Sequence, residues 1–219
     1  MSPIGDDHFR DAGPSHEWSE YYRKTLHEPP RATLLLALEL FAENWRDELR
    51  PSTPLAIDLG CGGGRDTVEL LQQGWRVLAI DAEPDAIAAL HAATHDLGEI
   101  ELDTVIARFE TFNLPSAQLI NGSFALPLCP PAEFHELWRR MVAALLPGGR
   151  ISGHLYGDRD SWAAPGSGKT GITFLKRKEV DHLLEDLEVE RMFEEETDAE
   201  RPIGQAKHWH IYHIVARKP

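Results

Sequence analysis

The sequence predicts an α/β domain, with a seven-stranded, mostly parallel sheet, an antiparallel last strand and helices on both faces. Two observations support this prediction. Short apolar runs alternate with stretches in which apolar residues recur at helical spacing, which is the pattern of βαβ units. Two strand-like segments, 188–195 and 207–218, then follow each other without a helix between them, so we expect an antiparallel hairpin. The 219 residues suit one such domain.

The clearest βαβ unit lies within residues 55–81. Residues 55–59 form a short apolar run typical of a buried strand, and the glycine-rich turn GCGGG follows at 60–64. A helix is predicted from Arg65 to Gly74, and a second buried strand is predicted to close at Asp81. Such a unit places backbone N–H groups and a helix N-terminus at the carboxyl end of the sheet. We therefore expect a cofactor there, in space left by the missing side chains of Gly60 and Gly62.

Glycine spacing indicates which cofactor this is. The dinucleotide fingerprint G-x-G-x-x-G needs glycine at position 65, where this chain has Arg65. The pattern acid-x-G-x-G-x-G fits residues 58–64, beginning at Asp58, and Asp81 can accept hydrogen bonds from ribose hydroxyls. With these motifs the chain resembles the class I S-adenosylmethionine-dependent methyltransferases. The resemblance implies a Rossmann-like fold, S-adenosyl-L-methionine as cofactor and S-adenosyl-L-homocysteine as product.

The resemblance extends over residues 30–218. LLPGGRISGHLYG at 145–157 is similar to the family's turn and fifth strand, and KHWHIYHIVARK at 207–218 is similar to the end of tellurite-resistance-type and related small-molecule methyltransferases. Residues 30–219 are accordingly expected to form the methyltransferase domain, and residues 1–29 an N-terminal arm and lid. Helical spacing predicts helices at 31–49, 84–91, 132–146 and 176–187, and strand-like runs begin at 102 and 117.

The family pattern assigns cofactor contacts to four regions: the glycine turn for the methionine end, the end of the second strand for the ribose, the loop after the third strand for adenine, and the end of the fourth strand for the methyl group. The residues in these regions are Asp58, Gly60, Cys61, Gly62, Arg65, Asp81, Ala82, Glu110, Thr111, Phe112, Asn121, Ser123 and Phe124. The loop at 121–124 lacks the [DN]-P-P-[YFW] motif of amino-methylating members, which argues against methylation of adenine or glutamine.

Two further sets of residues are expected near the acceptor. His154 and Tyr156, at the end of the fifth sheet strand, are the candidate catalytic residues if a general base is used. A methyl-transfer pocket must exclude water, and the sheet is open at its carboxyl edge, so a lid is expected. The lid candidates are Trp18, Tyr21, Tyr22 and Arg23, with Trp162 in the loop 158–171 as the competing candidate.

Composition argues against several other classes. With 22 basic and 36 acidic side chains the net charge is −14, which disfavours nucleic acid as a partner. Cys61 and Cys129 lack zinc or disulfide spacing, and His208 and His210 alone make a poor metal site, so we expect no metal. GSGKT at 166–170 lacks the first glycine of a P-loop. Without a membrane-spanning or signal-like run, a cytoplasmic protein is expected.

Two alternatives to a small-molecule methyltransferase remain. A catalytically silent S-adenosylmethionine-binding module would share every cofactor motif and lack turnover. A dinucleotide-dependent oxidoreductase would need the glycine that is missing at position 65. The sequence does not indicate the oligomeric state or the acceptor atom.

Overall fold

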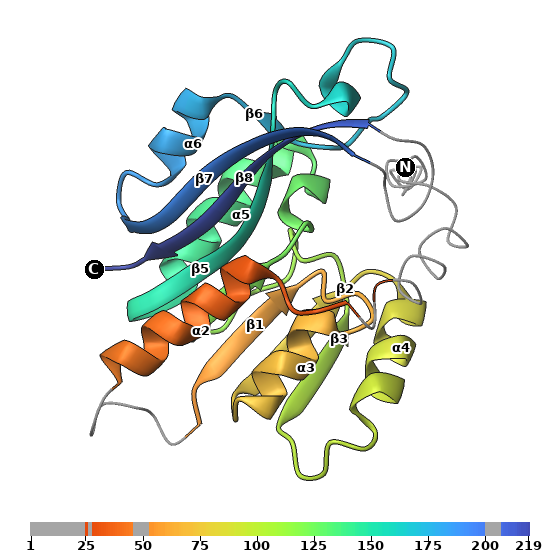
Figure 1. The fold of residues 1–219 in the computed structure, drawn as a ribbon. Helices are drawn as coiled ribbons and strands as arrows, with labels where there is room; N and C mark the ends of the chain where they lie inside the picture. Colours follow the sequence, from red (N-terminus) through yellow and green to blue (C-terminus); the bar gives the residue numbers. More distant parts are fainter. Residues whose placement is uncertain (1–24, 26–27, 46–52, 200–206) are drawn as a thin grey trace, which may run out of the picture.

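The computed structural model describes residues 25, 28–45, 53–199 and 207–219 (Figure 1). Its centre is one sheet in the order β3-β2-β1-β4-β5-β8-β7, with β6 paired to β5 off this path. The strands are β1 (Leu55–Leu59), β2 (Arg76–Asp81), β3 (Leu102–Ile106), β4 (Ala117–Gly122), β5 (Leu145–Gly157), β6 (Phe174–Leu175), β7 (Glu188–Ala199) and β8 (Lys207–Arg217).

The strand directions confirm the predicted fold class. The pairs β1–β2, β2–β3, β1–β4 and β4–β5 are parallel, whereas β8 is antiparallel to both β5 and β7. The strand β6 was not predicted, because two residues are too few to show a period. It pairs in parallel with the end of β5, through Tyr156 and Gly157.

Helices cover both faces of the sheet. They are α2 (Ala32–Asn44), α3 (Arg65–Gln72), α4 (Pro84–Thr94), α5 (Pro131–Ala144) and α6 (Arg177–Leu183). Apolar residues of α2, α3 and α4 belong to one buried cluster, and those of α5 and α6 belong to another on the opposite face. Figure 1 shows α2 and α3 on the near side of the sheet. This is the layer arrangement that the helical spacing predicts.

One predicted core position is wrong. Leu146 was expected to face inward from the end of a helix over 132–146, but α5 ends at Ala144 and Leu146 is 37% exposed. The chain is already extended at Leu145, so successive side chains alternate: Leu145 is buried and Leu146 points to solvent.

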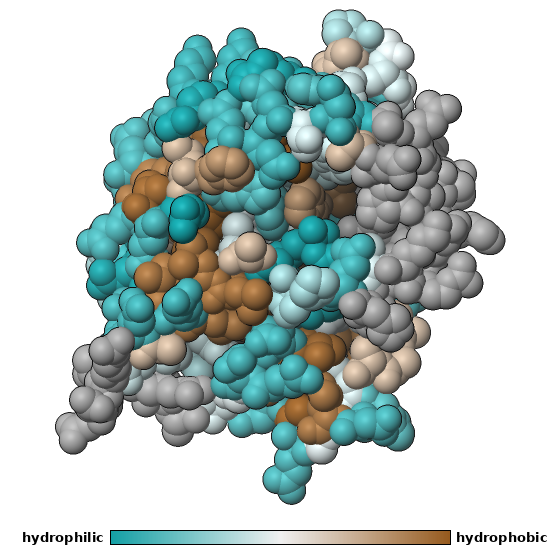
Figure 2. All heavy atoms as spheres, in the orientation of Figure 1, coloured by the Kyte–Doolittle hydropathy of each residue, from teal (hydrophilic) through white to brown (hydrophobic). Residues whose placement is uncertain are grey.

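The near side of the molecule also carries hydrophobic surface. Figure 2 shows hydrophobic side chains over α2 and the β7–β8 hairpin, and the large hydrophobic residues exposed on these elements are Leu35, Val189 and Phe193. Among the described residues, no helix has both the length and the apolar character that a bilayer crossing requires.

Candidate functional site

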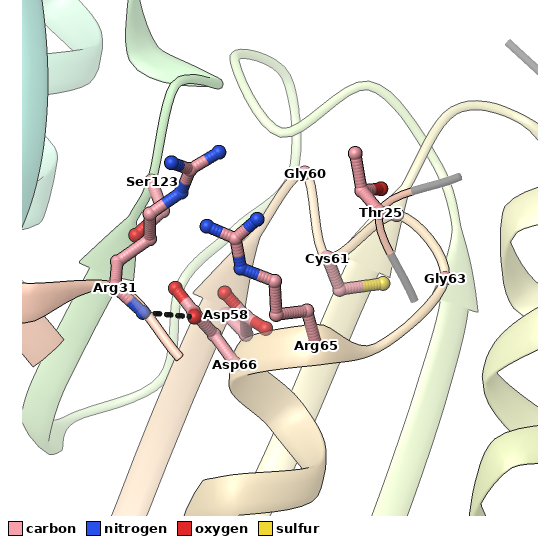
Figure 3. Close-up of a pocket in the computed structure, with 10 residues that line it drawn as sticks. Thr25, Arg31, Asp58, Gly60, Cys61, Gly63, Arg65, Asp66 and Ser123 are labelled. Carbon is pink, nitrogen blue, oxygen red and sulfur yellow. Dashed lines mark hydrogen bonds between the residues drawn. The ribbon is translucent and has the colours of Figure 1, made fainter. Parts of the chain in front are cut away.

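A pocket open to solvent lies where the carboxyl ends of β1 and β4 meet the N-terminus of α3 (Figure 3). Counted together with the open solvent at its mouth, the unfilled space there is about 430 Å³. We call it the polar pocket, and its lining residues are Thr25, Arg31, Asp58, Gly60, Cys61, Gly62, Gly63, Arg65, Asp66 and Ser123. Six of the predicted cofactor residues are therefore brought together: Asp58, Gly60, Cys61, Gly62, Arg65 and Ser123.

The glycine turn is shaped partly by the protein itself. Gly60, Gly62 and Gly64 all have positive φ, at 66°, 53° and 94°, where other residues are strained. A Cβ on Gly60 would lie 2.4 Å from Cβ of Ala125, and one on Gly64 would lie 2.4 Å from Leu90. The backbone conformation of the turn and the packing against Ala125 therefore both require glycine at position 60, apart from any space that it leaves for a cofactor.

Asp81 braces this turn from the end of β2. Its Oδ2 accepts a hydrogen bond from the Gly62 N–H at 2.9 Å, and its Oδ1 accepts one from the Glu83 N–H at 3.0 Å. Burial raises the pKa of the Asp81 carboxyl, although these backbone N–H groups oppose the rise. Each carboxylate oxygen keeps a further acceptor site, since each has two lone pairs. The neighbouring Ala82 is partly exposed beside it.

Two buried carboxylates form the floor of the polar pocket. Asp58 and Asp66 are 2% and 5% exposed, and the Asn121 side-chain amide donates to both, at 2.9 and 3.0 Å. The Thr67 hydroxyl donates to Asp58 at 2.6 Å. Burial, and then the Asp66 charge, raise the pKa of Asp58 to about 7. Asn121 itself is fully buried, so it holds the carboxylates together from beneath and does not line the pocket.

Two guanidinium groups face these carboxylates across the polar pocket (Figure 3). Arg31, at the N-terminus of α2, donates its backbone N–H to Asp66 at 3.0 Å, and its guanidinium lies 4.4 Å from the centre of the Phe124 ring. Arg65, the first residue of α3, pairs with Glu28 at 2.5 Å. The polar pocket therefore presents two guanidiniums and two carboxyl groups, a set of partners that suits the carboxylate and ammonium of an α-amino acid.

Sequence reasoning missed four residues of this pocket, which are Thr25, Arg31, Gly63 and Asp66. Gly63 belongs to the predicted glycine turn but was not among the expected cofactor contacts. Asp66 directly follows Arg65, so the helix start that was predicted there could have included it. Thr25 and Arg31 precede the sheet, and nothing in their local sequence indicates that they reach the pocket. Tertiary packing brings them there, since α2 lies across β5 and β8.

The predicted adenine region does not line the polar pocket. Glu110 is 7% exposed and its carboxylate pairs with Arg108. The Arg140 guanidinium donates to the backbone carbonyls of Glu110 and Phe112, which fixes this loop against α5. Thr111 is exposed, and Phe112 packs partly buried against the core.

His154 lies beside the polar pocket, behind Phe124. Its side chain is 2% exposed in total and stacks on the Phe124 ring at 4.0 Å between centres. The His213 ring packs edge-on at 4.9 Å. Burial lowers the pKa of His154 well below its usual range, and the positive charges of His213, Arg31 and Arg65 lower it further. The imidazole is therefore neutral at pH 7.

The second candidate, Tyr156, lies in a different environment. It belongs to a group that we call the aromatic cluster, which consists of Tyr156, Asp160, Trp162, Phe174, Lys207 and Trp209. The Lys207 ammonium lies 3.7 Å from the Trp162 ring centre and 3.9 Å from that of Trp209, and it pairs with Asp160 at 2.7 Å. Asp160 also accepts the Trp162 N–H at 2.9 Å.

These contacts bear on the lid. Trp162, the competing lid candidate, is fixed to the start of β8 through Asp160 and Lys207. The other candidates, Trp18, Tyr21, Tyr22 and Arg23, lie outside the described residues. Thr25 and Glu28 of this segment are among the residues that the structure describes. Thr25 lines the polar pocket, and Glu28 pairs with Arg65.

One group of possible metal ligands occurs in the described part of the chain. Ligand atoms of Glu194, Glu196 and His210 lie within 4.8 Å of one another. The sequence did not reveal the two glutamates beside His210, because β7 and β8 are brought together only by the fold. The Arg159 guanidinium reaches into the same group, 2.5 Å from Glu194, 2.7 Å from Glu196 and 3.1 Å from His210. Its positive charge therefore already compensates the negative charge of the two carboxylates.

Comparisons with known proteins agree with this geometry. Residues 56–149 match the family model described as a methyltransferase domain. A curated relative, the probable cobalt-precorrin-6B C(15)-methyltransferase (decarboxylating) of Methanothermobacter thermautotrophicus, is 34% identical over 103 residues. The match covers 44% of this chain and 50% of the relative, so the chain spans about half of that protein's length.

Solved structures show the same fold. TehB from Haemophilus influenzae has a TM-score of 0.66 at 17% identity, covering 83% of this chain and 66% of that one. Magnesium protoporphyrin IX methyltransferase from Synechocystis, with S-adenosylmethionine bound, has a TM-score of 0.65 at 14% identity and full coverage of both chains. The 1,6-didemethyltoxoflavin-N1-methyltransferase of Burkholderia thailandensis has a TM-score of 0.62 at 20% identity, covering 100% and 92%.

Proposed function

We propose that this chain, whose residues 56–149 match a methyltransferase domain, transfers the methyl group of S-adenosylmethionine to a small molecule. The observation that supports this most directly is the charge pattern of the polar pocket. Its two guanidiniums and two buried carboxylates lie around the glycine turn, whose Gly60, Gly62 and Gly63 line the pocket without side chains. The amino-acid end of S-adenosylmethionine carries the complementary pair of charges.

Each part of the cofactor then has a proposed partner. Arg31 and Arg65 would take the carboxylate, and Asp58 with Asp66 the ammonium group, through charge-assisted hydrogen bonds. Asp81 would accept the ribose hydroxyls, and the loop at 110–112 would contact adenine. Ser123 and Phe124, at the end of β4, would lie nearest the methyl group.

The protein does not need to form a covalent intermediate in this reaction. Methyl transfer from a sulfonium is an in-line displacement, so the main contribution is to align acceptor, methyl and sulfur in a site that excludes water. His154 and Tyr156 remain the proposed catalytic candidates. A small-molecule acceptor is supported by two structural neighbours whose names give one, a protoporphyrin and a didemethyltoxoflavin.

Calorimetry with three ligands tests the cofactor proposal. S-Adenosylhomocysteine should bind, and 5′-methylthioadenosine, the same nucleoside without the amino-acid end, should bind at least about a hundredfold more weakly, because about 2.8 kcal/mol of charge-assisted contact is lost. Arg65→Met should lower the first affinity and leave the second unchanged. Arg76→Met, at an exposed arginine that pairs with Asp103, is the matched control.

The same experiment separates the alternatives. Binding of NAD without S-adenosylhomocysteine would support the dinucleotide oxidoreductase and contradict our proposal. A screen of small molecules with methyl-labelled S-adenosylmethionine then distinguishes an enzyme from a silent binding module, since the silent module would bind the cofactor and label no acceptor.

A further inference from the structure

The position of His154 connects the polar pocket with the aromatic cluster. On β5 its side chain is on the same face as Ser152 and Tyr156, because alternate residues of a strand share a face. Ser152 donates to Asn121 under the polar pocket at 2.8 Å, whereas Tyr156 belongs to the aromatic cluster. Phe124, which stacks on His154, also lies 6.4 Å from both Tyr156 and Trp209. An acceptor that reaches the methyl group near Ser123 therefore has His154 and aromatic rings around it.

The imidazole has an unused hydrogen-bonding atom. Nδ1 of His154 is buried and has no hydrogen-bond partner among the described residues. An unsatisfied buried nitrogen costs on the order of 1–3 kcal/mol, and such atoms are rare in native proteins except where a ligand or water completes them. In the empty protein the unsatisfied nitrogen of His154 therefore costs free energy, and a bound hydrogen-bonding group can remove this cost.

The charges around His154 limit which chemical group can bind to its free ring nitrogen. The charged or titratable groups that act on it are His213 from β8, Arg31 from the start of α2 and Arg65 from α3, and all of them are basic. Since they lower the pKa of His154, the imidazole stays neutral and one of its ring nitrogens is a hydrogen-bond acceptor. A cationic amine would meet the same repulsion. An uncharged hydrogen-bond donor meets none.

We propose that His154 is a catalytic residue that receives the proton of an uncharged, flat acceptor, a phenol or a heteroaromatic ring N–H, stacked among Phe124, Tyr156 and Trp209. This rests on the proposed methyltransferase function. The oxygen or nitrogen of the acceptor forms a bond to the methyl carbon, and the carbon–sulfur bond breaks with its electron pair remaining on sulfur. The proton of the acceptor passes to the free imidazole nitrogen of His154 and leaves to solvent with the product.

A weak base suffices for this step. The acceptor group becomes strongly acidic only as its bond to the methyl carbon forms, so the proton is transferred late. Phe124 covers a face of the imidazole and has a left-handed backbone, with φ of 57°. Such strain is common at functional sites, and we expect this side chain to move when an acceptor enters.

A matched pair of probes tests the hydrogen bond. Indole and benzofuran have the same bicyclic shape, but only indole has an N–H. With S-adenosylhomocysteine bound, the wild-type protein should bind indole about fivefold to tenfold more tightly than benzofuran, as one hydrogen bond implies. His154→Phe should abolish this preference and keep the affinity for S-adenosylhomocysteine, whereas the control His95→Gln, at an exposed histidine at the C-terminal end of α4, should keep both.

Turnover tests the proton transfer. His154→Gln retains a hydrogen-bond acceptor but cannot act as a base, so it should keep the indole preference while the kcat of an acceptor found by labelled methyl transfer falls roughly a hundredfold or more. The proposal is overturned if the wild-type complex binds neither probe or binds them equally, or if His154→Gln turns over normally. Failure of S-adenosylhomocysteine itself to bind would instead overturn the proposed function.

Discussion

The polar pocket and the aromatic cluster lie at the same edge of the sheet but differ in whether their charged side chains line an open space or are enclosed by the protein. In the polar pocket, Asp58 and Asp66 share donors beneath an open space lined by two arginines. In the aromatic cluster, the Lys207 and Asp160 side chains are 4% and 0% exposed, and each neutralises the other. Charges that line an open pocket can be reached by a ligand, whereas charges that the protein encloses hold two segments together. Mutations in the two regions should therefore affect different measurements.

The largest effect is expected in the aromatic cluster. Asp160→Ala leaves the Lys207 ammonium buried without its carboxylate, which should lower the free energy of unfolding by about 3–5 kcal/mol in urea denaturation. Asp158→Ala is the control, because that carboxylate is partly exposed and lies 4.0 Å from Arg159; it should cost less than about 1 kcal/mol. A loss below 1 kcal/mol for Asp160→Ala would show that the pair does not hold the loop.

In the polar pocket, the effect should appear in binding. Asp81→Ala should weaken S-adenosylhomocysteine binding by roughly 2–4 kcal/mol, because charge-assisted bonds to the ribose are lost. Calorimetry measures this, and urea unfolding of the ligand-free protein should change much less. Unchanged affinity would exclude Asp81 as the ribose partner. A large loss of stability instead would mean that Asp81 serves mainly to brace the Gly62 turn.

Removing the segment before α2 should have a smaller effect on binding. Deletion of residues 1–27 removes Thr25 from the pocket wall and should weaken cofactor affinity or turnover by at least about tenfold, or roughly 1.4 kcal/mol. The melting temperature without ligand should hardly change. Thr25→Ala alone serves as the control for the direct contact. A truncated protein that binds and turns over normally, or that unfolds, would refute the lid assignment.

The smallest effect concerns pH. With its pKa raised to about 7, Asp58 is mostly protonated at pH 6 in the empty protein, and it must lose this proton to face an ammonium group. Affinity for S-adenosylhomocysteine should therefore rise about fivefold between pH 6 and pH 7, with proton release on binding. Calorimetry in two buffers of different ionisation enthalpy detects the proton. Asp58→Asn should abolish the pH dependence, and a flat wild-type profile would contradict the assignment.

Local sequence determined much of the polar pocket. Asp58, Gly60, Gly62 and Arg65 lie within one strand-turn-helix unit, where strand, left-handed glycines and helix start follow from neighbouring residues alone. The mostly parallel sheet with its antiparallel last strand followed similarly, because parallel crossovers and a terminal hairpin leave few topologies. Sequence was less informative where an element was too short to show a period, as in β6, or where the helix end at Ala144 turned directly into a strand.

Only the tertiary structure decided which distant residues join each region. Arg31 reaches Asp66 because α2 lies across β5 and β8, and Lys207 meets Asp160 because β8 runs antiparallel beside the end of β5. It also decided that Glu110 pairs with Arg108 and that Asn121 is fully buried. The physical reason is that a side chain's partners depend on burial and on sheet pairing between segments far apart in the chain, and neither leaves a periodic signal in the sequence around it.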